Sequence, residues 1–229
     1  MNAKISEIFQ SIQGEGKYLG VRQVFIRFFG CELNCRWCDT VYARDLRAGG
    51  FTEMDVDEIM GRVALIWGGC HSISLTGGEP LLQVDFLKEL LPQLKKARQR
   101  IYLETNGIKA KALQEIVNDI DIIAADIKLP SSTQGPPFWK EHAEFLRLAR
   151  QQDLFVKTVI TADTHIEDIR RAVAIVAEVD PAVTLILQPE SGDCNEDVFD
   201  KCRFFQKSCL QTLADVRIVP QIHKILGLR

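Results

Sequence analysis

The sequence predicts an α/β fold in which parallel strands alternate with helices along a chain of 229 residues. Apolar runs rich in Val, Ile, Leu and Phe recur along it, as is typical of parallel strands that are covered on both faces. Amphipathic segments lie between these runs, which is the pattern of repeated βα units. About six such units are too few for a closed eight-unit barrel, so we predict an incomplete (partial) TIM-type barrel.

Each element can be located from its own sequence. Strands are predicted at Gln23–Phe29, Ser72–Thr76, Ile101–Glu104, Ile122–Asp126, Leu154–Ile160 and Thr184–Gln188, with a shorter one at Val216–Val219. Helices are predicted at Asp55–Trp67, Val84–Arg98, Lys109–Asn118, Pro137–Arg150, Ile166–Glu178 and Glu196–Thr212. Asp55 and Glu58 have the spacing of a capping box, and Thr164 and Glu167 repeat it before a later helix. No linker divides the chain, so we expect a single domain over residues 1–229.

Composition and charge exclude several classes of protein. The formal net charge of −3 gives no sign of bulk attraction to nucleic acid or to an anionic membrane. The first ten residues, MNAKISEIFQ, lack the apolar core of a signal peptide. No run approaches the ~20 apolar residues that span a bilayer. We therefore expect a cytoplasmic protein that binds neither nucleic acid directly nor a membrane.

Three cysteines directly follow the first predicted strand. Cys31, Cys35 and Cys38 have the spacing C-x3-C-x2-C within GCELNCRWCDT. Three thiolates on one loop can hold three irons of a four-iron, four-sulfur (4Fe–4S) cluster and leave the fourth iron open. An open iron in a reducible cluster is a place to bind and cleave S-adenosylmethionine (SAM). The motif therefore predicts a radical enzyme.

Two other uses of these thiols fit less well. Structural zinc takes four protein ligands, usually as two separated pairs, and no second pair is present. The candidates for additional ligands are Cys70 with His71, Cys194, Cys202 and Cys209. A disulfide framework is typical of small secreted chains, whereas this chain is large and has few cysteines for its size. We expect these other four cysteines to be buried apolar side chains.

Polar or glycine-rich segments follow five of the predicted strands. Because ligands bind beyond the carboxyl ends of parallel strands, these segments should share one rim. They are Cys31–Thr40, Thr76–Pro80 (TGGEP), Glu104–Gly107 (ETNG), Asp126–Lys128 and Gln188–Glu190. In TGGEP, two glycines allow the backbone to approach a ligand closely, such as the amino-acid end of SAM.

Several rim residues have two interpretations. Glu104 and Asn106 could bind ribose hydroxyls, or they could form an Asn-Gly turn that closes the strand. Asp126 and Lys128 could contact SAM or form a structural ion pair. Lys157, within a predicted strand, could likewise contact SAM or be a buried, paired lysine.

Two residues of the cysteine loop are also ambiguous. Trp37 could shield the cluster while its backbone meets adenine, or it could only pack within the loop. Thr40 could offer its hydroxyl to Mg²⁺, which prefers oxygen ligands and retains waters. By residue type alone, a helix N-cap is the favoured role for Thr40.

Two further segments add a family resemblance. Together with the cysteine loop, TGGEP and ETNG, the segments EIFQSIQGEGKYLG (Glu7–Gly20) and PQIHKILGLR (Pro220–Arg229) make the chain resemble the 7-carboxy-7-deazaguanine synthase family of radical SAM enzymes. The resemblance extends from Glu7 to Arg229. It implies a radical SAM core that converts 6-carboxy-5,6,7,8-tetrahydropterin to 7-carboxy-7-deazaguanine and ammonia. A 5'-deoxyadenosyl radical takes hydrogen from C6, and the ring then contracts, as a step towards queuosine-type 7-deazapurines.

The resemblance also assigns site residues and partners. It places the substrate on Ile12, Gln13, Gly14, Glu15, Arg27, Thr76, Gln221, His223 and Arg229. With the rim residues, the residues expected to contact SAM are Trp37, Cys38, Asp39, Gly78, Glu104, Asn106, Asp126, Ile127 and Lys128. The resemblance favours Thr40 as a ligand of Mg²⁺ after all. It further implies regenerated SAM, a flavodoxin- or ferredoxin-type electron donor and a homodimer.

One segment departs from the family pattern, because many members have Ser-Pro-Lys where this chain has Asp126-Ile127-Lys128. Lys128 is therefore a firmer SAM contact than Asp126. Two other functions remain as alternatives. A glycyl-radical-enzyme activase has the same cysteine spacing but acts on a protein, and an electron-transfer or metal-scaffold protein holds a cluster without SAM chemistry. The fold of the Tyr42–Met54 segment is left open.

Overall fold

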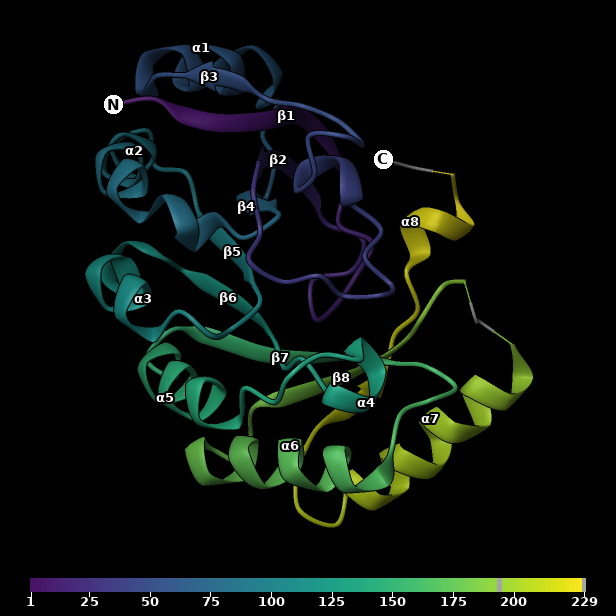
Figure 1. Ribbon diagram of the computed structural model, residues 1–229. Helices are drawn as coiled ribbons and strands as arrows, with labels where there is room; N and C mark the ends of the chain where they lie inside the picture. Colours follow the sequence, from purple (N-terminus) through teal and green to yellow (C-terminus); the bar gives the residue numbers. More distant parts are fainter. Residues whose placement is uncertain (193–194, 228–229) are drawn as a thin grey trace.

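The computed structural model describes residues 1–192 and 195–227, and these form one sheet with helices on its outer side (Figure 1). The sheet has nine strands in the order β3-β1-β2-β4-β5-β6-β7-β8-β9. Within the described residues, no strand pairing joins β3 to β9, so the sheet curls without closing. The predicted incomplete barrel is confirmed.

All of the predicted strands are present and run parallel to one another. They are β2 (Arg22–Phe28), β4 (Ser72–Gly77), β5 (Ile101–Thr105), β6 (Ile122–Asp126), β7 (Asp153–Ile160), β8 (Thr184–Pro189) and β9 (Val216–Ile218). Two further strands were not predicted. β1 (Ala3–Ile12) pairs antiparallel with β2, and β3 (Thr52–Met54) pairs antiparallel with β1. The Tyr42–Met54 segment thus contributes an edge strand after the short 3₁₀ helix η1 (Val41–Ala43).

The helices lie close to their predicted positions. The longer ones are α1 (Val56–Ile66), α2 (Val84–Lys96), α3 (Ala110–Ile116), α5 (Trp139–Ala149), α6 (Ile166–Val179) and α7 (Glu196–Cys209). Short helices are α4 (Pro130–Thr133), α8 (Ile222–Ile225), η2 (Pro80–Gln83) and η3 (Val117–Asp119). In Figure 1, α4 and α8 lie at the open side of the barrel, while α2, α3, α5 and α6 lie outside the sheet. No helix in the part of the chain that the structure describes is long and apolar enough to cross a membrane.

One of the two predicted helix caps is confirmed. At the start of α1, the Asp55 carboxylate accepts from the Glu58 N–H, and the Glu58 carboxylate accepts from the Asp55 N–H. The second cap is wrong. The N-cap of α6 is His165, and the Thr164 hydroxyl instead accepts a hydrogen bond from the Thr161 N–H, 2.8 Å away. The Thr164 side chain therefore stabilises the loop before α6 instead of capping the helix.

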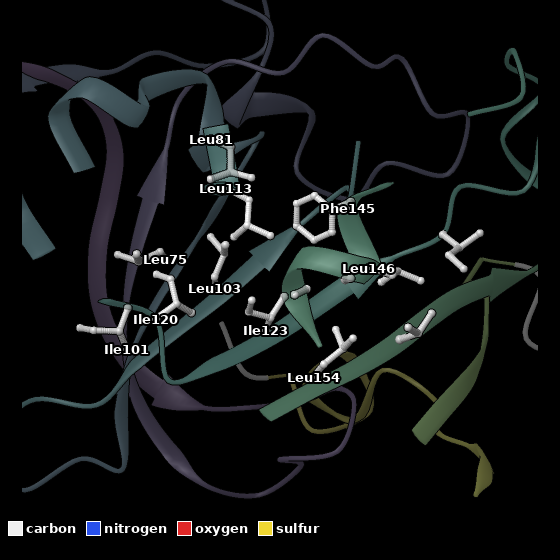
Figure 2. Packing of buried hydrophobic residues seen from close by; sticks show 14 of the residues in the cluster. Leu75, Leu81, Ile101, Leu103, Leu113, Ile120, Ile123, Phe145, Leu146 and Leu154 are labelled. Atoms are coloured by element: carbon white, nitrogen blue, oxygen red, sulfur yellow. The ribbon is translucent and has the colours of Figure 1, made fainter. Parts of the chain in front are cut away.

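The main hydrophobic core fills the space between the sheet and its helices. Figure 2 shows Leu103 of β5 and Ile123 of β6 packed near Leu113 of α3 and Phe145 of α5, all of them fully buried. Side chains at alternate positions of the same strands point to the other face, inside the barrel. There, a smaller apolar cluster is formed by Tyr102, Ile122, Ala124, Phe155 and Ile186.

The inner face becomes polar toward the carboxyl ends of the strands. Two residues after three of these inner apolar residues, the side chain that lines the cavity is charged: Glu104 follows Tyr102, Asp126 follows Ala124, and Lys157 follows Phe155. This alternation places functional side chains inside the barrel mouth while their neighbours in sequence remain in the core. The fold therefore presents a polar cavity on a rigid apolar base.

Candidate active site

A cavity of about 390 Å³ occupies the mouth of the barrel, at the carboxyl ends of the parallel strands. Most of the site residues expected from the sequence line it: Ile12, Gln13, Gly14, Glu15, Arg27, Cys31, Cys35, Trp37, Cys38, Asp39, Thr40, Thr76, Gly78, Glu104, Asn106, Asp126, Lys128, Gln221 and His223. Ile127 does not, because its side chain is buried in the core and its backbone groups are bonded to Lys157 and Thr158. Arg229 lies outside the described residues.

The three motif cysteines lie together on the loop after β2. Cys31, Cys35 and Cys38 are partly buried free thiols that line the cavity. Burial raises the pKa of Cys31 to about 11, and it also raises the pKa of Cys35. Such thiols stay protonated until a metal displaces the proton. Three thiols on one loop that line the same cavity fit a cluster that has one iron free for a ligand.

The TGGEP turn packs directly against the start of the cysteine loop. The Gly78 N–H donates to the Phe28 carbonyl (3.0 Å), and the Glu79 N–H donates to the Gly30 carbonyl (2.8 Å). Gly77 has a φ of +128°, which favours glycine. A Cβ on Gly78 would lie 2.0 Å from the Gly30 oxygen. The glycines therefore fix the distance between the TGGEP turn and the cysteine loop.

Glu79 ties the TGGEP turn to the next rim loop. Its fully buried carboxylate accepts from the Leu81 N–H (3.0 Å), the Thr105 hydroxyl (2.9 Å) and the Asn106 N–H (2.8 Å). Burial raises the pKa of Glu79 to about 7 in spite of these donors. The sequence placed this residue in a motif but gave it no role.

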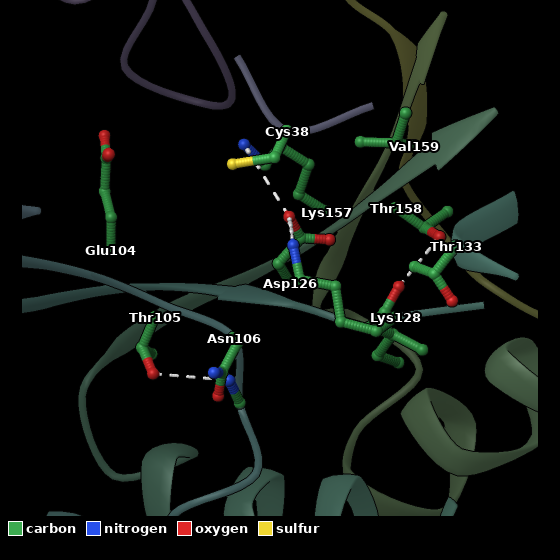
Figure 3. A network of polar contacts seen from close by, with 12 residues as sticks. Cys38, Glu104, Thr105, Asn106, Asp126, Lys128, Thr133, Lys157, Thr158 and Val159 are labelled. Atoms are coloured by element: carbon green, nitrogen blue, oxygen red, sulfur yellow. Dashed lines mark hydrogen bonds and ion pairs between the residues drawn. The ribbon is translucent and has the colours of Figure 1, made fainter. Parts of the chain in front are cut away.

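A second loop contact fixes Trp37. The Lys128 ammonium lies 4.6 Å from the centre of the Trp37 ring, and the Trp37 indole N–H donates to the Ser132 hydroxyl (3.0 Å). The Lys128 ammonium also binds the Asp126 carboxylate at 2.7 Å (Figure 3). Both interpretations of Asp126 and Lys128 are therefore compatible with the structure, because the ion pair itself lines the cavity.

In the ETNG and Asp126–Lys128 segments of the rim, two buried polar atoms have no protein partner among the described residues. They are Oδ1 of Asp126 and Nδ2 of Asn106. A buried polar group without a partner costs free energy, so such atoms usually await a ligand or water. Both belong to loops that the sequence assigned to SAM. The residues present thus fit a ligand that has hydroxyl or amino groups.

A second pair of charges lies toward the other side of the cavity. Lys157 forms an ion pair with Glu15, and its ammonium lies 4.0 Å from the Asp126 carboxylate. Burial alone raises the pKa of Glu15, but the charge of Lys157 and hydrogen bonds from Gln221 and Lys157 outweigh it and lower the pKa to about 2. Glu15 is therefore a carboxylate at neutral pH, and Lys157 is a partly buried, paired lysine that lines the cavity.

Glu104 is grouped with the expected substrate residues. Its carboxylate accepts from the Gln13 amide (2.7 Å) and from the Thr76 hydroxyl (2.6 Å). The Gln13 amide oxygen also accepts from the Glu15 N–H (3.0 Å). These contacts build a continuous polar wall from Thr76 to Glu15. The sequence suggested two roles for Glu104, a contact to ribose or a part of an Asn-Gly turn. Neither role predicts its hydrogen bonds to Gln13 and Thr76.

Arg27 is held between aromatic rings and a carboxylate. Its guanidinium carbon lies 5.6 Å from the centre of the Phe9 ring and 5.9 Å from that of Tyr42. Its Nε donates to Glu7 (2.9 Å), and the Tyr42 hydroxyl donates to the same Glu7 oxygen (2.8 Å). Sequence reasoning identified Arg27 but not Glu7 or Tyr42, because antiparallel β1 and the η1 segment bring these two residues to the site.

The segment around α8 covers the cavity from the side of β1. The Ile222 N–H donates to the Gly14 carbonyl (3.0 Å), and a Cβ on Gly14 would lie 2.3 Å from Nδ1 of His223. The Gln221 amide donates to both Glu15 (2.6 Å) and Asp39 (3.1 Å). This segment therefore bridges the IQGEG loop and the cysteine loop.

Thr40 precedes η1, but its hydroxyl makes no capping hydrogen bond. The hydroxyl oxygen lies 3.8 Å from the Cys38 sulfur and lines the cavity. Thr40 therefore occupies the N-cap position expected from its residue type, but its side chain does not cap the helix. An oxygen in this position, beside the Asp39 carboxylate in the chain, fits a hard cation such as Mg²⁺.

Comparison with known proteins defines the class first. The family model of the radical SAM superfamily matches residues 25–178, so the chain is a radical SAM protein and an enzyme of that superfamily. A 7-carboxy-7-deazaguanine synthase of Geobacter sulfurreducens is 40% identical over 98% of this chain and 97% of that protein. One of Methanothermobacter thermautotrophicus is 34% identical over 100% of this chain and 99% of that protein. The chain belongs to the 7-carboxy-7-deazaguanine synthase family, whose radical SAM core implies a 4Fe–4S cluster and SAM as cofactors.

Solved structures support the fold. The crystal structure of QueE from Escherichia coli matches with a TM-score of 0.68 and 21% identity, over 96% of this chain and 94% of that one. A structure of TYW1 with a lysine–pyruvate adduct bound matches with a TM-score of 0.56 and 16% identity, over 83% of this chain and 74% of that chain. At these identities the likeness concerns the fold alone.

Replacing Gly78 with Ala should destabilise the protein, whereas the same change at Gly61 should stabilise it. The new Cβ at Gly78 would collide with the Gly30 carbonyl, and overpacking of this kind costs ~1–3 kcal/mol. Gly61 lies in α1 with no atom within 4 Å of a Cβ, so Ala should gain ~0.5–1 kcal/mol there. Urea denaturation under anaerobic conditions measures both changes. Equal free energies of unfolding for Gly78→Ala and the wild type would contradict the packing described.

Replacing Glu79 with Gln should remove one pH dependence of stability. The pKa of Glu79 in the folded protein, about 7, lies above the ordinary value of 4.5, so folding favours the protonated form. Its contribution to stability is therefore complete below pH 4.5 and is lost as the pH rises through 7. Urea denaturation across this range should show the fall in the wild type and in a control, Glu53→Gln, at an exposed position. A Glu79→Gln variant that shows the same fall would refute this origin.

Proposed function

We propose that the protein converts 6-carboxy-5,6,7,8-tetrahydropterin to 7-carboxy-7-deazaguanine and ammonia. The observation that carries the proposal is that one cavity is lined both by the three motif cysteines and by carboxylate, amide and guanidinium groups. Relatives with this family name align over nearly the whole chain, which supports the same assignment. The reaction would supply the synthesis of 7-deazapurines such as queuosine.

The cluster-binding half of the cavity would generate the radical. When bound to Cys31, Cys35 and Cys38, the cluster would supply the electron that cleaves SAM to a 5'-deoxyadenosyl radical, and SAM would be regenerated after turnover. Asn106 and Asp126 would hold SAM, because each has a buried side-chain atom without a protein partner among the described residues. The Gly78 backbone and Lys128 would complete this side of the SAM site, since both residues line the same cavity. Trp37 would limit the movement of the bound cofactor.

The opposite half would bind the pterin. A carboxylated pterin has an amino-pyrimidinone edge that donates hydrogen bonds, and carboxylates are the natural acceptors for it. Glu15 fits this role because it remains charged. We assign Glu104 to the same edge rather than to SAM, because Gln13 and Thr76 orient its carboxylate while lone pairs remain free.

Arg27 would bind the substrate carboxylate. Its guanidinium is held by Glu7 and the rings of Phe9 and Tyr42, so little side-chain entropy would be lost on binding. Thr40 would ligate Mg²⁺, which would neutralise the substrate oxygens beside it. His223 would close the pocket from α8, and Arg229 remains assigned to substrate only by the family pattern. These contacts would hold C6 in place and exclude water from the radical.

We also infer the partners of the enzyme. Reduction of the cluster needs an electron donor of the flavodoxin or ferredoxin type. A homodimer and a single-domain chain are proposed on the family pattern. A glycyl-radical-enzyme activase is the less favoured alternative, because the covered cavity is small for a protein loop.

Anaerobic turnover tests the function directly. The reduced wild-type enzyme with SAM and the carboxypterin should form 7-carboxy-7-deazaguanine, with more than one product molecule for each SAM consumed. Cys35→Ser should abolish the product, whereas Cys70→Ser should retain it, because Cys70 is buried away from the cavity and its sulfur accepts a hydrogen bond from Gln10. Formation of 5'-deoxyadenosine without the deazaguanine would refute the substrate. Absence of SAM cleavage would refute radical chemistry.

Replacing Arg27 with Gln should weaken recognition of the substrate carboxylate. A charge-assisted hydrogen bond is worth ~1.5–3 kcal/mol, so kcat/KM for the carboxypterin should fall roughly 10- to 100-fold. Tetrahydropterin without the carboxylate should bind the variant and the wild type equally well. Arg22→Gln is the control, since Arg22 lies at the other end of β2 and its guanidinium donates to the exposed Gly68 carbonyl. An equal loss of affinity for both pterins would contradict the assigned role.

A further inference from the structure

His142 is a buried histidine behind the cavity rather than in it. It lies in the first turn of α5 with a relative exposure of 1% and does not line the cavity. No motif in the sequence includes it. Its ring packs edge-on against Phe138, with the ring centres 6.5 Å apart, and its two nitrogen atoms point to two different rim loops.

Both ring nitrogens bond to backbone groups. Nε2 accepts from the Lys128 N–H at 3.1 Å, and Nδ1 lies 3.0 Å from the Gly107 carbonyl oxygen. A backbone N–H can only donate and a carbonyl can only accept, so the ring is neutral with its proton on Nδ1. Burial lowers the pKa of His142 to about 4, which keeps this form at neutral pH.

The two bonded groups belong to neighbouring rim loops. Gly107 ends the ETNG loop after β5, directly beyond Asn106, and Lys128 ends the segment after β6. Gly107 has a φ of +69°, and a Cβ there would lie 3.3 Å from Nδ1 of His142. The ring therefore fits tightly between the loops and determines their separation.

The held backbone positions carry the side chains that face the cavity. From the Lys128 backbone, the side chain extends to the Asp126 carboxylate and the Trp37 ring. On the other loop, Asn106 lies next to the held Gly107, and its side-chain nitrogen has no protein partner among the described residues. A change in loop separation would therefore move Asn106 relative to the Asp126–Lys128 pair.

We propose that His142 is a positioning residue for SAM, which clasps the ETNG and Asp126–Lys128 loops at the separation that the bound cofactor requires. The inference rests on the proposed function, because it takes these loops as the SAM site. His142 does not touch the reacting atoms. Its effect on affinity passes through the two backbone hydrogen bonds alone.

Three substitutions of His142 distinguish the effect of its bond to Gly107 from the effect of its bond to Lys128. His142→Phe keeps an aromatic ring but removes both bonds. His142→Asn retains a donor near the Nδ1 position and should keep the bond to Gly107, whereas His142→Gln retains an acceptor near the Nε2 position and should keep the bond to Lys128. If His142→Phe does not fold, the Asn and Gln variants provide the test.

The readout is the dissociation constant of SAM for the cluster-loaded protein, measured by equilibrium dialysis. We expect it to rise at least about tenfold in His142→Phe and about three- to tenfold in the other two variants, since each bond is worth a modest factor. The KM of the carboxypterin should change less than the dissociation constant of SAM. Hydrogen exchange of the Lys128 amide should accelerate in the Phe and Asn variants and remain slow in the Gln variant.

Phe145→Leu is the matched control. It lies one turn further along α5, is fully buried in the main core, and should destabilise the protein without weakening SAM binding. If His142→Phe binds SAM as tightly as the wild type, the inference about His142 is overturned and the proposed function is unaffected. The same holds if Phe145→Leu loses as much SAM affinity as His142→Phe. A wild-type protein that binds no SAM would overturn the proposed function and this inference with it.

Discussion

The site depends on the alternation of side chains along parallel strands that curl into a barrel. On β5, Leu103 packs into the outer core while its neighbour Glu104 faces the cavity. The same division occurs on β7 between Val156 and Lys157. Because one strand provides both the core and the site, the functional groups are fixed by the burial of their neighbours. A register shift of one residue in such a strand would move the carboxylate or ammonium into the core, at a high desolvation cost.

The buried charges of the cavity are balanced in pairs. Two ammonium groups, of Lys128 and Lys157, face two carboxylates, of Asp126 and Glu15. Each charge is costly to bury alone, and the pairing offsets that cost in a confined space. Polar groups already charged and oriented need little rearrangement when a ligand arrives. The cavity thus retains a polar interior without a large net charge, and this suits a cofactor such as SAM that carries both signs of charge.

Sequence patterns predicted those parts of the structure that repeat or that form motifs. The continuous apolar runs gave every parallel strand, and the cysteine spacing located the site. β1 was not predicted because its apolar and polar residues are mixed, as is typical of an antiparallel strand at one side of a sheet. Glu7, Glu79 and His142 gained roles only in the structure, because a single polar residue in a sequence does not reveal what it will be buried against. Ile127 is the opposite case, a residue that was predicted in the site but lies in the core. Its position between two site residues in the sequence does not decide where its side chain points.

In the two halves of the cavity, the residues that bond to one another differ greatly in their separation along the sequence. The carboxylate of Glu79 bonds the Asn106 N–H only 27 residues away, whereas Gln221 bonds Glu15 across 206 residues. Closing a long loop costs more chain entropy than closing a short one, so the contact between Gln221 and Glu15 is the more costly of the two to form. The half that holds the cofactor can therefore take shape before the half that selects the substrate. A nascent or partly folded chain would possess the means to bind a cluster before it possesses a closed chamber to contain the radical.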